Sequence, residues 1–159
     1  TVILDVCQEE QVQAPLDKTE KTGKRAGYRQ CDISKEEKVK QVFEEIADTY
    51  GRVDILVNNA GVVADWNTSY QVNALGTYYC SEAARPYLEK TKGNIVILTS
   101  ASVFSGGTGI PQYVTTKAGS YALTRFLARE YARLGIRVNG IAPAVVMSKM
   151  LAKSEAKRS

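Results

Sequence analysis

The stretch Ile95-Val-Ile-Leu-Thr-Ser-Ala-Ser102, followed closely by Tyr113-Val-Thr-Thr-Lys117, decides the fold of this chain. Residues 95–98 are a short, β-branched apolar run that follows Gly93-Asn94, and this pattern predicts a buried strand. A glycine-rich loop comes next, and from residue 113 to residue 134 apolar side chains recur at helical spacing. The tyrosine and the lysine therefore lie one turn apart on one face of a predicted helix.

Tyr113 and Lys117 form a pair that can carry acid–base chemistry. An ammonium group held within a few ångströms of a phenol favours the phenolate, which makes a tyrosine usable as an acid or base near neutral pH. The spacing alone is weak evidence, because the chain contains nine tyrosines and many lysines. Ser100 strengthens it, since it lies at the predicted carboxyl end of the preceding strand, where its hydroxyl can face Tyr113 across a crevice.

Five motifs occur in order along the chain. They are Asn58-Asn-Ala-Gly61, Val72-Asn73-Ala-Leu-Gly76, Ser100, Tyr113-x-x-x-Lys117 and Val138-Asn-Gly-Ile-Ala-Pro143-Ala144. Together they resemble the short-chain dehydrogenase/reductase family, and the resemblance extends from about Val2 to Met150. It implies a single dinucleotide-binding oxidoreductase domain over residues 1–159. The implied fold is α/β, a Rossmann-like doubly wound parallel sheet with helices on both faces.

Composition argues against several other classes. The sequence contains no histidine, which removes Ser-His-Asp hydrolases, Cys-His proteases and histidine-based zinc enzymes, and we expect no metal. Cys7, Cys31 and Cys80 are odd in number and far apart, which favours a reducing, cytoplasmic setting. The net charge of +4 comes from scattered basic residues, so we expect no nucleic-acid partner. No apolar run reaches the length of a membrane-spanning helix, so we expect no membrane partner.

The predicted strand from Thr1 to Leu4 ends at Asp5, whose carboxylate can accept hydrogen bonds from the adenosine ribose of a dinucleotide. Because that carboxylate repels a 2′-phosphate, we expect NAD in preference to NADP. A plain strand-end aspartate that begins a turn is the alternative. By the resemblance, the other contacts on this side are Asp32 and Ile33, which flank the adenine, and Asn59, Ala60 and Gly61, which face the cofactor.

The resemblance places further cofactor contacts near the nicotinamide. They comprise Tyr113, Lys117, Pro143, Ala144, Val146 and Ser148. The family usually has Pro-Gly where Pro143-Ala144 stands, and Thr at the position of Ser148. Alanine adds one methyl group there and the serine keeps the hydroxyl that meets the carboxamide, so we expect binding to be retained.

The function that the resemblance implies is NAD(P)-dependent interconversion of a secondary alcohol and its ketone by hydride transfer. Tyr113 is then the general acid/base, Ser100 binds the substrate oxygen, and Lys117 favours the phenolate and holds the nicotinamide ribose. The resemblance also puts Asn73 at a helix distortion, where its main-chain carbonyl holds a water that completes a proton relay. Two other classes stay open: an epimerase or dehydratase of the extended family, and a catalytically idle cofactor-binding protein.

Two helices, predicted over residues 67–90 and 113–134, carry more apolar side chains than one sheet face needs. The excess includes Tyr78, Tyr79, Tyr121, Phe126 and Tyr131. Members of the family pair such helices across a two-fold axis. We therefore expect a homotetramer or homodimer.

One strand of the implied sheet has no counterpart in this sequence. Sheets of this type run in the order 3-2-1-4-5-6, yet no Gly-x-x-x-Gly-x-Gly occurs in the chain and its first strand resembles the second of that order. Without the central strand, residues 1–5 would stand two strand spacings, about 9.6 Å, from residues 53–57. We therefore expect the full polypeptide to carry roughly 40 or more residues before Thr1, about ten near Ala64, and a carboxyl-terminal strand.

Overall fold

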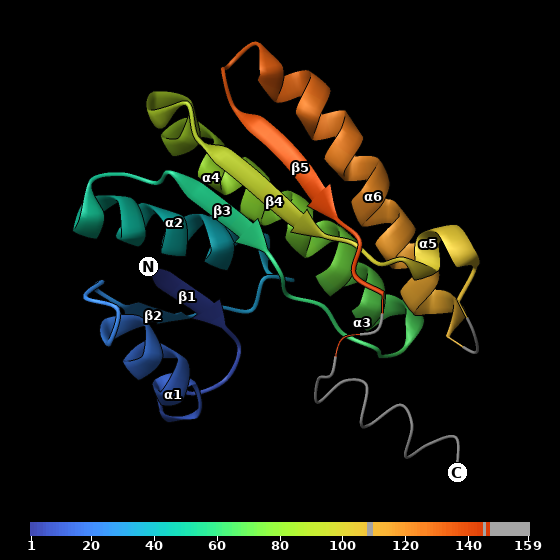
Figure 1. Cartoon of the computed structure of the whole chain (residues 1–159), viewed down its shortest axis with the longest axis horizontal. Helices are drawn as coiled ribbons and strands as arrows, with labels where there is room; N and C mark the ends of the chain where they lie inside the picture. Colours follow the sequence, from blue (N-terminus) through green and yellow to red (C-terminus); the bar gives the residue numbers. More distant parts are fainter. Residues whose placement is uncertain (108–109, 145, 147–159) are drawn as a thin grey trace.

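The computed structural model describes residues 1–107, 110–144 and 146, and its elements alternate between strand and helix (Figure 1). In chain order they are β1 (Val2–Asp5), α1 (Glu9–Glu20), β2 (Gly27–Gln30), α2 (Glu36–Tyr50), β3 (Ile55–Asn58), α3 (Trp66–Tyr70), the π-helical η1 (Gln71–Gly76), α4 (Thr77–Thr91), β4 (Asn94–Leu98), α5 (Ser102–Ser105), α6 (Pro111–Ala132) and β5 (Arg137–Ile141). All strand pairs are parallel. The α/β, Rossmann-like class predicted from the sequence is confirmed.

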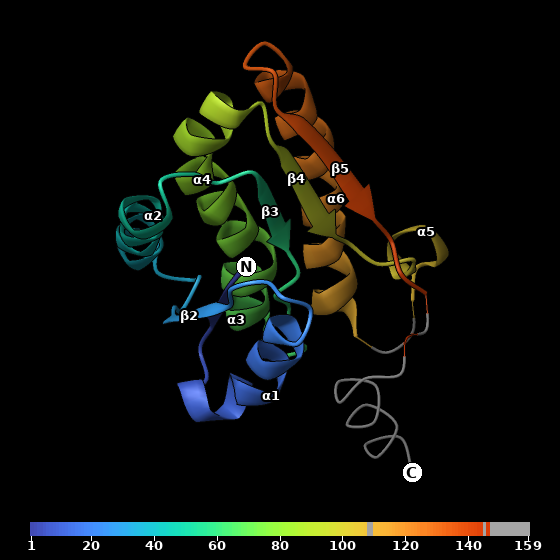
Figure 2. The ribbon, with the colours of Figure 1, turned by 60° about the vertical axis from the view of Figure 1, so that its left-hand side comes forward.

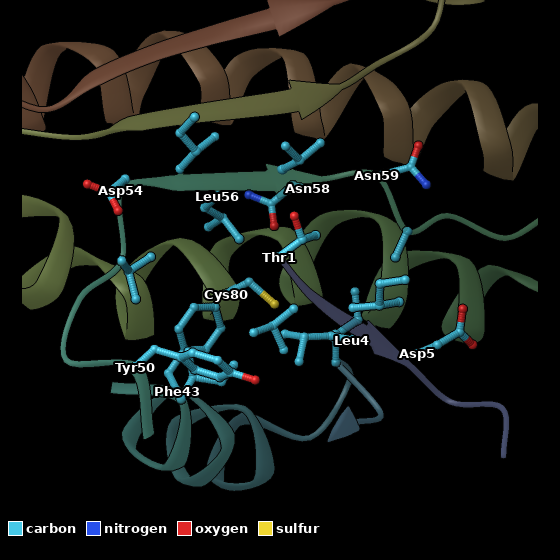
Figure 3. A pocket seen from close by; sticks show the side chains of 18 of the residues that line it. Thr1, Leu4, Asp5, Phe43, Tyr50, Asp54, Leu56, Asn58, Asn59 and Cys80 are labelled. Atoms are coloured by element: carbon cyan, nitrogen blue, oxygen red, sulfur yellow. The ribbon is translucent and has the colours of Figure 1, made fainter. Parts of the chain in front are cut away.

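The strands form two sheets, and within the described ranges no ladder joins them. β1 pairs with β2, while β4 lies between β3 and β5. β1 and β3 run in the same direction (Figure 1), and the side chains of both line a groove (Figure 3). The groove encloses about 860 Å³ and follows both strands from Thr1 to Asp5 and from Ile55 to Asn58. This separation of the two sheets is the arrangement that the sequence predicts, since no stretch of it supplies a strand between β1 and β3.

β4 forms the centre of the main core. Its side chains alternate, so that Ile95 and Ile97 point to one face, where both are fully buried. α4 and α6 cover this same face (Figure 2) and contribute Leu88 and Leu127, which are also fully buried. Each such side chain stabilises the fold by about 1.5–3 kcal/mol. This packing fixes α6 against the carboxyl end of β4, where the candidate site lies.

The helix predicted over residues 67–90 is three consecutive segments, α3, η1 and α4. In η1 the six residues Gln71–Gly76 are wound as a π-helix, so the distortion that the resemblance implied at Asn73 is present. Hydroxyl groups of Thr77 and Ser120 donate to the Asn73 carbonyl oxygen. Side-chain hydrogen bonds of this kind compete with the helical ladder, and single π turns often mark functional sites.

A short junction at Ala64 connects the segment after β3 to α3. The Ala64 amide donates to the Ser69 hydroxyl at 3.2 Å, and its carbonyl accepts from the Gln112 side chain at 3.0 Å. Asp65 then caps α3 by accepting from the Thr68 amide at 3.0 Å. Hydrogen bonds therefore hold this junction closed, and the expectation of further residues near Ala64 stays a prediction.

No helix in the described part of the chain is both long enough and apolar enough to cross a membrane. The helix α6 begins at Pro111, two residues before the predicted start. Proline suits that first position because its fixed φ matches the helix and its missing N–H would have no helical partner there.

Candidate active site

The carboxyl end of β4 and the first two turns of α6 bring the predicted tyrosine–lysine pair together. The Lys117 side chain is 4% exposed, and its Nζ donates to the carbonyl of Leu98, the last residue of β4, at 2.8 Å. Nζ also lies 6.0 Å from the centre of the Tyr113 ring. Tyr113 itself is half-buried, so its ring remains accessible at the edge of this site.

Lys117 is a buried cation with a neutral hydrogen-bond partner. Burial lowers the pKa of Lys117 below the ordinary value of a lysine. Within the described residues no carboxylate forms an ion pair with it. Its charge is therefore poorly screened by protein carboxylates.

Gly61 lets the backbone after β3 approach this lysine. A Cβ atom at Gly61 would lie 3.1 Å from Lys117 Nζ and 3.5 Å from Asn73 Oδ1. A side chain there would press on the ammonium group, so the close approach favours glycine. The preceding Asn59 and Ala60 are exposed and line the end of the groove, as Figure 3 shows for Asn59.

The side chain of Asn73 clamps this backbone segment to α6. Its Oδ1 accepts from the Val62 amide at 2.8 Å, and its Nδ2 donates to the Val62 carbonyl at 3.0 Å. The second proton of Nδ2 goes to Thr116 Oγ1 at 3.0 Å. Asn73 is fully buried, and its bond to Thr116 forms away from competing water, while the two bonds to Val62 are part-buried. Thr116, one residue before Lys117, was missed by the sequence analysis, because its partner lies 43 positions away.

The main-chain carbonyl of Asn73 has different partners from the water implied by the resemblance. It accepts from the Thr77 hydroxyl at 2.9 Å and from the Ser120 hydroxyl at 2.7 Å. A carbonyl oxygen has two lone pairs, and both are used here. A relay water at this oxygen would have to displace one of the hydroxyl groups. The relay role of Asn73 therefore stays a prediction, whereas its clamping contacts are structural facts.

Ser100 lies two residues after β4 and is 9% exposed. Its Oγ accepts from both the amide and the hydroxyl group of Ser102, at 3.2 and 2.8 Å. Ser102 is the first residue of the short helix α5, in a stretch for which the sequence predicts a loop. The sequence signal for Ser102 was only its spacing of two from Ser100.

The adenosine-side candidates lie at the ends of β1 and β2. Asp5 ends β1 at the edge of the groove (Figure 3), and its Oδ1 accepts from the Cys7 amide at 3.0 Å. Asp32 likewise accepts from the Ser34 amide at 3.0 Å. Both carboxylates thus shape turns, which is the alternative stated for Asp5 above. Ile33 is buried and lines the groove.

The structure describes three of the four candidate cofactor contacts that follow β5. The Pro143 carbonyl accepts from the amide of Ala101 at 2.9 Å, which holds this segment next to Ser100. Ala144 and Val146 are exposed, Val146 to 61%. Ser148 lies outside the described residues.

Comparison with known proteins identifies relatives of this chain. The family model described as short chain dehydrogenase matches residues 1–159. The (2S)-[(R)-hydroxy(phenyl)methyl]succinyl-CoA dehydrogenase subunit BbsD of Thauera aromatica is 32% identical over 159 residues, covering 94% of this chain and 64% of the subunit. The chain therefore spans less than two thirds of the length of that relative.

Solved structures share the fold. A crystal structure of NAD⁺-bound xylitol dehydrogenase superposes with a TM-score of 0.90 at 24% identity, covering 97% of this chain and 64% of the other. An alcohol dehydrogenase from the archaeon Thermococcus sibiricus, complexed with 5-hydroxy-NADP, gives a TM-score of 0.83 at 23% identity and covers 92% of this chain and 66% of the other. At these identities the likeness establishes the fold.

Proposed function

This chain belongs to the short-chain dehydrogenase family, and on that basis we propose that its protein interconverts a secondary alcohol and its ketone with a nicotinamide dinucleotide. The observation that carries the proposal is the placement of Lys117. Its buried Nζ lies 6.0 Å from the Tyr113 ring, donates to the carboxyl end of β4, and is approached by the backbone of Gly61. Such a site puts a phenol and a cation where a substrate oxygen can exchange a proton with the tyrosine.

Three residues of the chain have distinct roles in this proposal. Tyr113 takes the proton from the alcohol oxygen in one direction and returns it to the ketone oxygen in the other. Lys117 holds its positive charge beside the ring and so favours the phenolate. Ser100 donates a hydrogen bond to the same substrate oxygen and orients it. The dinucleotide, when bound, supplies or receives the hydride.

This chain has groups that can form hydrogen bonds with both riboses of a dinucleotide. At one end, the Asp5 carboxylate borders the groove and can accept from ribose hydroxyls. At the other, Lys117 has three ammonium protons, of which one goes to Leu98, so two can reach a ribose. Asn59 and Ala60 are exposed and line the same groove as Asp5, so they leave room for a dinucleotide to approach.

An absorbance assay tests the proposal. The protein is incubated with a panel of secondary alcohols and NAD⁺ or NADP⁺, and with the matching ketones and the reduced cofactors. A net change in nicotinamide absorbance with at least one pair is the expected result. Conversion of substrate without a net change would instead indicate an epimerase or dehydratase, and cofactor binding without conversion would indicate an idle binding protein.

Asp5→Ser is expected to relax a preference for NAD over NADP. The solved neighbours include one with NAD⁺ and one with an NADP derivative, so the preference rests on Asp5 alone. Removal of the carboxylate should raise kcat/KM with NADP about tenfold relative to NAD, since repulsion of the 2′-phosphate disappears. Asp17→Ser, an exposed aspartate of α1, is the matched control. Equal wild-type efficiency with both cofactors would contradict this assignment.

We further propose assembly through the apolar surface of α6 and its neighbours. Phe126 and Trp66 are each 56% exposed. The Phe104 ring packs edge-on against the ring of Tyr121. Tyr131 does not contribute to this surface, contrary to the sequence prediction, because it is buried and donates to a carboxylate of Glu82. Burial of this surface between two copies would cover it.

Light scattering tests the assembly. The wild-type protein is expected to have at least twice the mass of one polypeptide, and Phe126→Lys is expected to give a monomer, because a charge would be placed in an apolar contact. Val6→Lys, which alters a similarly exposed apolar residue elsewhere, is the control. A monomeric wild type would contradict the proposal.

A cytoplasmic setting remains part of the proposed function, supported by the buried free thiols of Cys31 and Cys80.

A further inference from the structure

The oxygen of Ser100 has an unusual set of partners for a group that is to bind substrate. The amide of Ser102 donates to Ser100 Oγ at 3.2 Å, and an amide can only donate. The Ser102 hydroxyl lies 2.8 Å from the same oxygen and donates to it. Both partners come from one residue at the start of α5, so they approach Ser100 from one side.

A count of lone pairs gives the consequence. A serine hydroxyl has one proton to donate and two lone pairs with which to accept. In this arrangement the amide and the hydroxyl of Ser102 occupy both lone pairs of Ser100 Oγ, which leaves the Ser100 proton for a substrate oxygen. The bond between the two hydroxyls can also reverse, because both hydroxyl protons rotate, so the donating state of Ser100 is one of two.

The Ser102 hydroxyl supports the state in which Ser100 donates to a substrate. With the amide bond alone, Ser100 would keep one free lone pair in that state. Ser100 is 9% exposed, so few water molecules can fill this position. Ser102 thus supplies the donor that completes the hydrogen bonds of Ser100 when it gives its proton to the substrate oxygen.

We propose that Ser102 is a positioning residue that holds Ser100 as a hydrogen-bond donor to the substrate oxygen. This inference rests on the proposed function. In ketone reduction the carbonyl oxygen accepts from Ser100 while Tyr113 supplies the proton. In alcohol oxidation the oxygen accepts from Ser100 and passes its own proton to Tyr113. Ser102 stabilises Ser100 in this donating state through its amide and its hydroxyl.

The turnover test uses a double-mutant cycle in the active protein. Ser102→Ala keeps the backbone amide and removes the hydroxyl, and it is expected to lower kcat about tenfold with KM for the cofactor unchanged, as for loss of one orienting hydrogen bond. Ser102→Thr restores the hydroxyl and is expected to restore kcat. In the Ser100→Ala background, Ser102→Ala should have no further effect, because Ser102 acts through Ser100.

Ser105→Ala is the matched control. It removes a hydroxyl from the same short helix, but this group bonds to the Ala101 carbonyl at 3.4 Å and not to Ser100. It should leave kcat within about twofold of wild type. Equal effects of the changes at 102 and 105, or independent effects of the changes at 100 and 102, would overturn the proposal.

A second cycle measures the hydrogen bond without turnover. Urea unfolding of the same four proteins is expected to show that the changes at 100 and 102 are not additive, because either one breaks the same bond. Additive unfolding free energies would overturn the contact itself. Absence of any turnover in the wild type would overturn the proposed function, and with it the role of Ser102 in that reaction, while unfolding would still decide on the bond.

Discussion

Replacement of Tyr113 by phenylalanine is expected to lower kcat by about two to four orders of magnitude, the usual contribution of general acid–base catalysis. The ring and its packing on α6 stay, and only the proton-transferring oxygen is lost. Cofactor affinity should remain near the wild-type value, since Lys117 and the backbone at Gly61 are unchanged. Steady-state kinetics together with a cofactor titration measure the two effects separately.

Tyr121→Phe is the matched control for this change. It lies two turns further along α6, and its ring packs edge-on against Phe104 with centres 5.4 Å apart, a contact that phenylalanine preserves. The same oxygen is removed outside the candidate site, so kcat should change by less than about twofold. Turnover of the Tyr113 variant within tenfold of wild type would contradict the assignment of the proton transfer to this residue.

Replacement of Asn73 by leucine is expected to give the largest loss of stability. The variant keeps a similar side-chain volume but removes the partner of the part-buried Val62 amide and carbonyl and the donor to the Thr116 hydroxyl, which keeps its own bond to the Gln112 carbonyl. Loss of a partner costs a buried polar group about 1–3 kcal/mol, and summed over these three bonds, with partial solvation of the Val62 groups, we expect a loss of about 3 kcal/mol. For a chain of this size the midpoint of thermal unfolding should fall by about 6–12 °C.

Two further variants locate the source of that loss. Asn59→Leu changes the same residue type at an exposed position of the segment that follows β3, and it should shift the unfolding midpoint by less than about 2 °C. Thr116→Val removes the bond from Asn73 together with the bond that the Thr116 hydroxyl donates to the Gln112 carbonyl, and it should cost about 1 kcal/mol, less than the change at Asn73. If Asn73→Leu were no more destabilising than Asn59→Leu, the clamp would not contribute to stability.

Much of the fold was readable from the sequence because its signals are local. The apolar run at residues 95–98 and the helical spacing after Tyr113 predicted β4 and α6, which the structure places at Asn94–Leu98 and Pro111–Ala132. A helix has 3.6 residues per turn, so residues four apart share a face whatever surrounds them. The spacing of Tyr113 and Lys117 on one helical face therefore followed from the sequence itself.

Only the tertiary structure decided what these residues contact. The Asn73 clamp joins Val62 to Thr116, and the carbonyl of Asn73 is occupied by hydroxyls from two helices. The amide and the hydroxyl of Ser102 both bond to Ser100 Oγ, and Ser102 belongs to a short helix in a stretch for which the sequence predicts a loop. The reason is physical: periodicity fixes which side of an element a residue occupies, whereas hydrogen-bond partners 11 to 47 positions apart are set by how packed elements meet.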